Sequence, residues 1–394
     1  KPAARYVDVT DGHNTETWLL FRRDTAVTDE GESHPVAVEV GFLLQEGNVV
    51  HAKNTELVVS FPTAKKSELG FLIQGPFKTT KARDNIAQDS EANQRLIETA
   101  AELAAGSLED LRDLGLLNVE SFKALPLKSS VFDDDGTRFF MPVYQAIHQA
   151  LKTKRLLPRY SGDFVAANEA RLARGAQLAD VYSPEQLGKL FGTERLYWLD
   201  TAITADRMPE LRDYLAGKQK QWSRNEWEQE PLVKGIEVEA KDIAAKLTAK
   251  FLEVQDESWL VRFYEYVDKN FEPYRSVPFV RLEDGQHILS SQAFLPPHDP
   301  SGIDMAVFPL VKQSLVERQD VVAFLRDKAK LREPDKVDVV IKCLLPKYQP
   351  GTLRFDQTEY QRDLQLIVAA CVGEGRHRMT PELRGTKFIA CMRA

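Results

Sequence analysis

The sequence is poor in residues that form covalent or metal crosslinks. Its 394 residues include only three cysteines, Cys343, Cys371 and Cys391, and seven scattered histidines. Three cysteines are too few for a disulfide framework, and the histidines give no zinc-ligand spacing. We therefore expect the cysteines to be small buried hydrophobic residues in a reducing cytoplasm.

Long apolar runs are also missing. A membrane helix needs about 18 uncharged apolar residues, and the best candidate, residues 364–372, is too short. Residues 1–5 carry no initiator methionine and precede no apolar signal core. We expect a chain that begins inside a longer cytoplasmic protein and has no membrane segment.

Positive charge is in deficit, with 52 Lys and Arg against 59 Asp and Glu, a net charge of −7. A protein that coats nucleic acid usually has the opposite balance. Nucleic acid is therefore a partner that the bulk charge does not indicate, although local basic patches remain compatible with it.

Motifs of self-contained catalysis are absent. Gly188-Lys189 lacks the upstream glycine and the Ser or Thr of a P-loop, and there is no G-x-G-x-x-G, nucleophile elbow or H-E-x-x-H. Asp135-Gly136-Thr137 is most simply a turn. We expect no metal site and no complete active site within the chain.

The first 80 residues favour strands. Short runs rich in β-branched and aromatic residues, separated by turns at 29–31 and 46–48, lie at 16–22, 35–44, 55–61 and 69–74. Alternation of Val36, Val38, Val40 and Phe42 predicts a half-buried strand. A helix over 93–103 with a cap at residue 89 or 90 follows, Gly106 interrupts it, and a second helix runs from 108 to 115.

The later sequence is mostly helical. We expect helices at 141–154, after Ser183-Pro184, at 206–215, two within 239–270, and at 321–330, 335–345 and 355–372. Residues 218–230 are a candidate linker, 280–287 a small β-hairpin and 387–391 a terminal strand. The fold class is α+β, with expected domains at 1–150 (α+β), 151–230 (helical) and 231–394 (helical and mixed).

One segment, residues 70–86, has the chemistry of an anion site. A strand leads through Gly75-Pro76 into a polar loop whose cations, hydroxyls and amide suit a terminal phosphate: Lys78, Thr79, Thr80, Lys81, Arg83 and Asn85. The alternative is a polar loop in which Thr and Asn satisfy local backbone groups and Arg83 pairs with an acid. The residues alone favour this alternative.

The same segment carries a family resemblance. Residues 61–63 (FPT), 70–80 (GFLIQGPFKTT) and 82–86 (ARDNI) closely resemble "FPT…FLIQGPYRTTPSRDNI" of sacsin-like bacterial proteins with a histidine-kinase-type (GHKL) ATPase domain. Phe77 and Lys78 stand where that pattern has Tyr and Arg, and Lys81-Ala82 where it has Pro-Ser. Lysine keeps the charge but loses the bidentate geometry of arginine.

Other motifs resemble the same family in the same order, at 203–215 (ITADRMPELRDYL), 251–264, 281–287 (RLEDGQH) and 345–348 (LPKY). Their simplest interpretations are structural. Trp259, Phe263 and Tyr264 are expected in the core, and the acids and bases of 281–287 on a hairpin with surface ion pairs. Arg207 is expected to pair within its helix with Glu210 and Asp213.

The resemblance implies a non-catalytic transducer, like the middle domain of Hsp90-like GHKL ATPases, followed by a helical platform. The Glu-x-x-x-Asn and Asp-x-Gly-x-Gly elements that hold ATP and Mg in that family are absent, so both would be bound mainly by a preceding domain. Hydrolysis would need that domain. The implied γ-phosphate-sensing loop comprises Lys78, Arg83, Thr79, Thr80, Asn85 and Gln74.

Its implied partners are the preceding ATPase domain, a protein client and a second copy of the chain. Two alternatives stay open. One is a protein-interaction scaffold without nucleotide dependence. The other is a component of a bacterial nucleic-acid-directed defence system, which would show salt-dependent retention on DNA.

Overall fold

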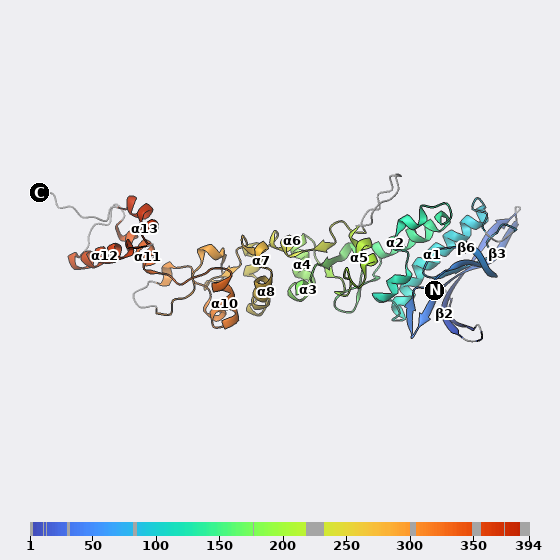
Figure 1. The fold of residues 1–394 in the computed structure, drawn as a ribbon, viewed down its shortest axis with the longest axis horizontal. Helices are drawn as coiled ribbons and strands as arrows, with labels where there is room; N and C mark the ends of the chain where they lie inside the picture. The colour runs from blue at the N-terminus through green and yellow to red at the C-terminus, as the bar shows by residue number, and fades with distance from the viewer. Residues whose placement is uncertain are drawn as a thin grey trace. The chain divides into compact units, whose positions relative to one another are not determined.

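The fold is seen in a computed structural model, which describes residues 3–10, 12, 14–29, 32–81, 85–175, 177–217, 232–299, 305–348, 356–373 and 375–386. The chain divides into two compact units, Lys1–Glu239 and Ala240–Ala394, here the first unit and the second unit (Figure 1). The fold class is α+β, as predicted, with the large sheet at the beginning and mostly helices afterwards. The expected three-domain division stays a prediction.

The first unit is built on a seven-stranded sheet with the order β1-β2-β3-β7-β5-β6, and β4 pairs with β3 beside this path. Neighbouring strands are antiparallel except β5 and β7, which pair in parallel. The strands are β1 (Ala3–Thr10), β2 (Thr15–Asp29), β3 (Glu32–Gln45), β4 (Asn48–Val50), β5 (Glu56–Val59), β6 (Phe61–Lys66) and β7 (Leu72–Gln74).

The strand predictions are confirmed in type and differ in extent. β1 and β4 were not predicted, and the predicted strand at 55–61 is two strands, because Ser60 turns the chain with φ 61°. Val38, Val40 and Phe42 are fully buried, as the alternation indicated. The opposite face also buries the Glu39 carboxylate, which accepts a 2.9 Å bond from Arg5.

One long helix, α1 (Glu91–Asp113), packs on the sheet (Figure 1). Ser90 caps it, and its predicted apolar face is buried. The predicted break at Gly106 is wrong. A glycine costs a helix about 1 kcal/mol, and the buried residues on both sides of Gly106, including Leu103 and Leu108, outweigh that cost. The chain turns at Gly115, with φ 73°.

The rest of the first unit joins the same hydrophobic core, which extends from Leu19 to Ile236. The predicted N-terminal capping of α4 (Pro184–Phe191) is confirmed: the Ser183 side chain accepts from Gln186 N, and the Gln186 side chain accepts from Ser183 N. The elements of the first unit that follow α1 are η1 (Glu120–Ala124), η2 (Ser129–Phe132), η3 (Arg138–Phe140), α2 (Met141–Thr153), β8 (Leu157–Pro158), β9 (Phe164–Val165), η4 (Ala167–Glu169), β10 (Ala170–Ala173), α3 (Gln177–Val181), α4 (Pro184–Phe191), β11 (Tyr197–Trp198), α5 (Pro209–Ala216) and β12 (Glu237–Val238).

The second unit is mostly helical, and its predicted hairpin, β13 (Val280–Arg281) with β14 (His287–Ile288), is confirmed. Three helices stand where two were expected within 239–270. The helices are α6 (Ala240–Ala244), α7 (Ala249–Glu253), α8 (Glu257–Lys269), η5 (Glu272–Tyr274), η6 (Ser290–Gln292), η7 (Met305–Val307), α9 (Gln313–Val316), α10 (Gln319–Asp327), α11 (Lys336–Val339), the π-helix η8 (Val340–Leu344), η9 (Leu345–Tyr348), α12 (Gln357–Ala370) and α13 (Gly375–Arg384).

Some predictions differ from the structure, and others concern residues that the structure does not describe. Cys343 and Cys371 form no disulfide in the described part of the chain and are half-buried rather than fully buried. Cys391, the candidate linker 218–230 and the candidate strand 387–391 lie outside the described residues. Among the described residues, no helix has the length and apolar character needed to cross a membrane.

Candidate functional site

The predicted phosphate-sensing loop projects from the end of β7. Phe77 and Ile86, on the two sides of the loop, are buried at 3% exposure each and fix its base in the core. Thr79 forms an antiparallel β-bridge with Ile86, and Thr80 N donates to Asn85 O at 2.9 Å. The loop is thus a small hairpin whose two sides are joined by backbone hydrogen bonds.

A buried asparagine on α1 anchors this hairpin, and sequence reasoning missed it. Asn93 is fully buried. Its Oδ1 accepts from Lys78 N at 2.8 Å, and its Nδ2 donates to Lys78 O at 2.9 Å and to Ala87 O at 2.8 Å. Asn93 therefore fixes the backbone from which the Lys78 side chain departs. The signal available in the sequence was an amide side chain at helical spacing from the apolar residues Leu96 and Ile97.

The predicted loop residues are brought together in part. Lys78, Thr80 and Asn85 are exposed and Thr79 is half-buried. Arg83 lies outside the described residues. Thr80 Oγ1 donates to Asn85 O at 3.3 Å, and Asn85 Oδ1 accepts from Ile86 N at 3.0 Å. These two polar side chains satisfy local backbone groups, as the structural interpretation of the loop expected.

Gln74 is the last residue of β7, half-buried, and its backbone pairs with Glu39 of β3 and Val58 of β5. The sheet register therefore fixes its position, whereas the loop residues are fixed by Asn93 and the hairpin. Lys78 follows Gln74 by four positions in the sequence, and Gly75-Pro76 lies between them.

At its other end, β7 is preceded by a tightly packed glycine. A Cβ on Gly70 would lie 2.4 Å from His51 Nδ1 and 2.5 Å from the Ala124 carbonyl oxygen. Only glycine allows this approach, because the nearest atoms include backbone that cannot rotate away. Gly70 thus brings the β7 segment against His51 and the end of η1.

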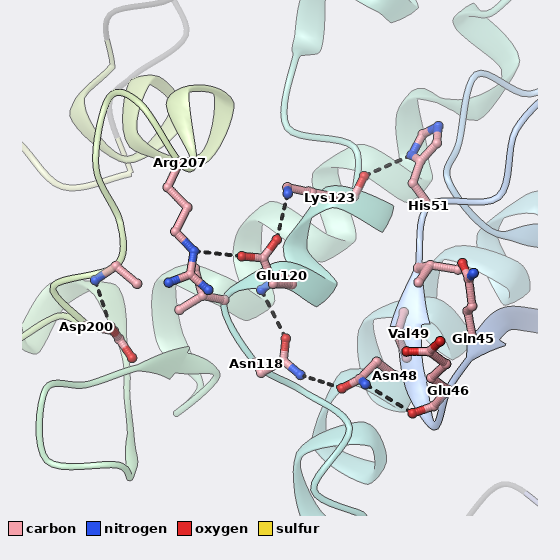
Figure 2. A pocket seen from close by; sticks show the side chains of 13 residues that line it. Gln45, Glu46, Asn48, Val49, His51, Asn118, Glu120, Lys123, Asp200 and Arg207 are labelled. Carbon is pink, nitrogen blue, oxygen red and sulfur yellow. Dashed lines mark hydrogen bonds and ion pairs between the residues drawn. The ribbon is translucent and has the colours of Figure 1, made fainter.

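His51, β4 and η1 line a pocket of about 710 Å³ in the first unit. Three segments form its walls: the end of the β3–β4 hairpin, residues 118–123 and residues 200–207. Figure 2 shows Glu120 in the middle of the pocket, with Arg207 and Lys123 beside it and Asn48, Glu46 and Gln45 on the opposite wall.

The central carboxylate is held by two cations. Glu120 accepts from Lys123 Nζ at 2.6 Å and from Arg207 Nε at 2.8 Å. These hydrogen bonds, from Lys123 and then from Arg207, lower the pKa of the Glu120 carboxyl. The prediction that Arg207 pairs with Glu210 and Asp213 is therefore wrong. Arg207 precedes α5, so it lies outside the helical spacing that this prediction assumed.

The other walls of the pocket carry both hydrogen-bond donors and hydrogen-bond acceptors. His51 Nδ1 donates to Lys123 O at 2.9 Å, because a carbonyl oxygen only accepts. Asn118 Nδ2 donates to Asn48 Oδ1 at 3.4 Å. Asp200 Oδ1 accepts from Ala202 N at 2.8 Å. These side chains offer hydrogen-bond donors and acceptors to a polar ligand, and the residues that line the pocket include no nucleophile–base pair.

In the second unit, the motif at 281–287 is not a surface ion-pair hairpin, so that prediction is wrong. His287 is 4% exposed, and burial, followed by the charge of Arg281, lowers its pKa to about 4. Arg281 donates to the carbonyls of Gln255, at 2.7 Å, and Glu253. It therefore closes the end of α7 instead of pairing with acids.

The core prediction for the aromatic motif is confirmed: Trp259, Phe263 and Tyr264 are 3%, 0% and 1% exposed. Within the described residues, no group of His, Cys, Asp and Glu is arranged to hold a metal ion. No protein-family model, curated protein or solved structure matches the chain. The functional argument therefore depends on the loop and the pocket themselves.

Proposed function

We propose that the first unit is the transducer of a GHKL-type ATPase and that the loop at 78–87 reads the nucleotide of a preceding domain. ATP and Mg²⁺ would be held mainly by that domain. The second unit would act as a platform that passes the resulting change to a protein partner. The chain itself would carry no complete catalytic site.

One observation carries this proposal: an exposed lysine departs from a backbone that is fixed on both sides. Phe77 anchors the chain just before Lys78, and Asn93 bonds both the N–H and the C=O of Lys78. A cation that must distinguish two ligands needs a defined position, since a loose one loses binding free energy to ordering. The exposed Lys78 side chain, on a backbone held by a buried anchor, meets this requirement.

The physical basis is differential affinity. ATP carries an anionic phosphate that ADP lacks, and a cation on a neighbouring domain lowers the free energy of the ATP-bound closed state more than that of the ADP-bound one. A ligand shifts a conformational equilibrium only by this difference. Lys78 would supply the charge, and Thr79, Thr80 and Asn85 would shape the loop; Arg83 and Gln74 complete the proposed set.

The test is ATP turnover by the full-length protein with Lys78→Ala, Lys78→Arg and the control Lys66→Ala. Lys66 is an exposed lysine on β6, outside the loop. We expect Lys78→Ala to lower turnover at least about tenfold, a loss of one charge-assisted contact. Lys78→Arg should retain it, and Lys66→Ala should leave it unchanged. Equal turnover in Lys78→Ala and Lys66→Ala, or a gene without an upstream ATPase domain, would contradict the proposal.

A further inference from the structure

Lys65 combines a buried position with an ionisable side chain. It lies on β6, the strand that ends one edge of the sheet. Burial alternates along β6, so Thr63 and Lys65 face inward and Lys66 faces solvent. Lys65 is 6% exposed, whereas a lysine is almost never this buried unless it is paired. Its surroundings therefore need an explanation.

The Lys65 amine has no hydrogen bond or ion pair with any of the described residues. Thr63, the inward-facing residue before it, is satisfied locally, because its Oγ1 donates to Leu57 O at 2.8 Å. Lys65 Nζ is not one of the fully enclosed polar atoms without a partner, so the nitrogen touches solvent at the end of a buried stem. The amine is thus open to a small reagent and lacks an acid in contact with it.

Two opposing effects decide whether this amine carries a proton. Burial disfavours the charged form, and the Asp134 carboxylate, in the turn after η2, favours it. Burial has the larger effect, so the pKa of the Lys65 ammonium is lowered. Asp134 makes no ion pair with Nζ; its Oδ1 accepts from Gly136 N at 2.6 Å. On the neighbouring strand β5, Glu56 pairs in register with Lys66 and so shares the opposite face of the sheet.

We infer that Lys65 is a site of covalent modification by small acyl phosphates. The lone pair of the neutral Nζ would attack the acyl carbon and form an amide bond. The bond from that carbon to the phosphate oxygen would break, and inorganic phosphate would leave with the proton lost by the amine. A desolvated lysine without a counter-ion suits this role, because only the neutral amine is a nucleophile.

The position of the amine also favours this class of donor. Since Lys65 reaches solvent only at the end of an enclosed stem, a small donor has better access than a bulky one. The product is an uncharged amide, so it adds no charge where burial opposes one. This inference does not depend on the nucleotide proposal.

The test is acetylation of the folded full-length protein by acetyl phosphate, followed at each lysine by mass spectrometry from about pH 7 to about pH 10. Lys66, the exposed next residue on the same strand, is the internal control. We expect Lys65 to react at least about threefold faster than Lys66 at the lower pH, and this ratio to fall at least about threefold at the higher pH. Access is the same throughout, so protonation alone produces such a fall. A slower Lys65 at the lower pH, or a constant ratio, would overturn the inference.

One variant tests the charge beside the amine. Asp134→Asn removes the carboxylate charge and keeps an Oδ1 that can accept from Gly136 N. Lys65 should then be acetylated about twofold faster near neutral pH, with Lys66 unchanged. Asp135→Asn, at the exposed next position of the same turn, is the matched control and should change neither rate. Equal effects of the two variants, or no effect of Asp134→Asn, would overturn the inference.

A second variant separates chemistry from structure. Lys65→Met keeps an unbranched stem and removes the amine. Its urea midpoint should equal or exceed that of the wild-type protein, because no partner of the amine is lost and a desolvated charge is removed. A lower midpoint would show that the amine stabilises the sheet edge, and it would contradict the assignment of Lys65 as a modification site.

Discussion

Replacing Asn93 by alanine should release the base of the loop at 78–87. The side chain makes three hydrogen bonds of 2.8–2.9 Å with Lys78 and Ala87, and it is fully buried. A buried bond contributes about 1 kcal/mol, and a backbone group left without a partner costs about 1–3 kcal/mol. We therefore expect Asn93→Ala to destabilise the loop by about 3 kcal/mol.

Hydrogen exchange followed by mass spectrometry measures this directly. At 1.4 kcal/mol per factor of ten, amide exchange in a peptide covering residues 76–90 should accelerate about 100-fold in Asn93→Ala. The control is Asn85→Ala in the same loop, since the exposed Asn85 side chain accepts a single hydrogen bond among the described residues, from Ile86 N, and the backbone bonds between Asn85 and Thr80 remain in the variant. Its effect should be within about 0.5 kcal/mol. Equal acceleration in the two variants would refute the assignment of Asn93 as the anchor.

Three further predictions concern stability. His287 stays neutral in the folded second unit until its pKa of about 4, whereas the unfolded chain takes up the proton near 6.5; stability should therefore fall by about 3 kcal/mol as pH drops through this window. His287→Gln should flatten this dependence in urea titrations, and an unchanged slope would refute it. Gly70→Ala should cost about 2 kcal/mol by overpacking against His51, seen as a lower urea midpoint; wild-type stability would contradict the packing argument. Asp338 is 6% exposed and binds Arg332 and Arg378. Asp338→Asn should destabilise α11 and α13 by about 2 kcal/mol, and unchanged amide exchange there would show that the cluster contributes nothing.

Local patterns predicted the elements well and their connections less well. The alternation at Val38, Val40 and Phe42 reports burial against α1, a short-range property that a two-residue period reveals directly. The break at Gly106 was wrong because intrinsic propensity was weighed without the sheet that α1 covers. β1 and β4 were missed although each pairs with a neighbouring strand across a short turn, because β1 is mostly exposed and β4 has only three residues, so neither shows an alternation of buried residues.

In the candidate site, too, local features were predicted and contacts between distant segments were not. The exposure of Lys78, Thr80 and Asn85 follows from the polar composition of the loop, whereas its anchor, Asn93, belongs to a helix and meets the loop only in the fold. Arg207 was assigned partners at helical spacing, yet it bonds Glu120, 87 residues earlier. The hairpin at 280–287 was predicted from its Asp-Gly turn, but the burial of His287 depends on packing that no local spacing encodes.

The transducer account is tested most directly by hydrogen exchange of the loop at 78–87 in the full-length protein with ADP and with a non-hydrolysable ATP analogue. The account predicts slower amide exchange at 78–81 with the ATP analogue than with ADP, and loss of this difference in Lys78→Ala. Identical exchange with the two nucleotides in the wild-type protein would contradict it.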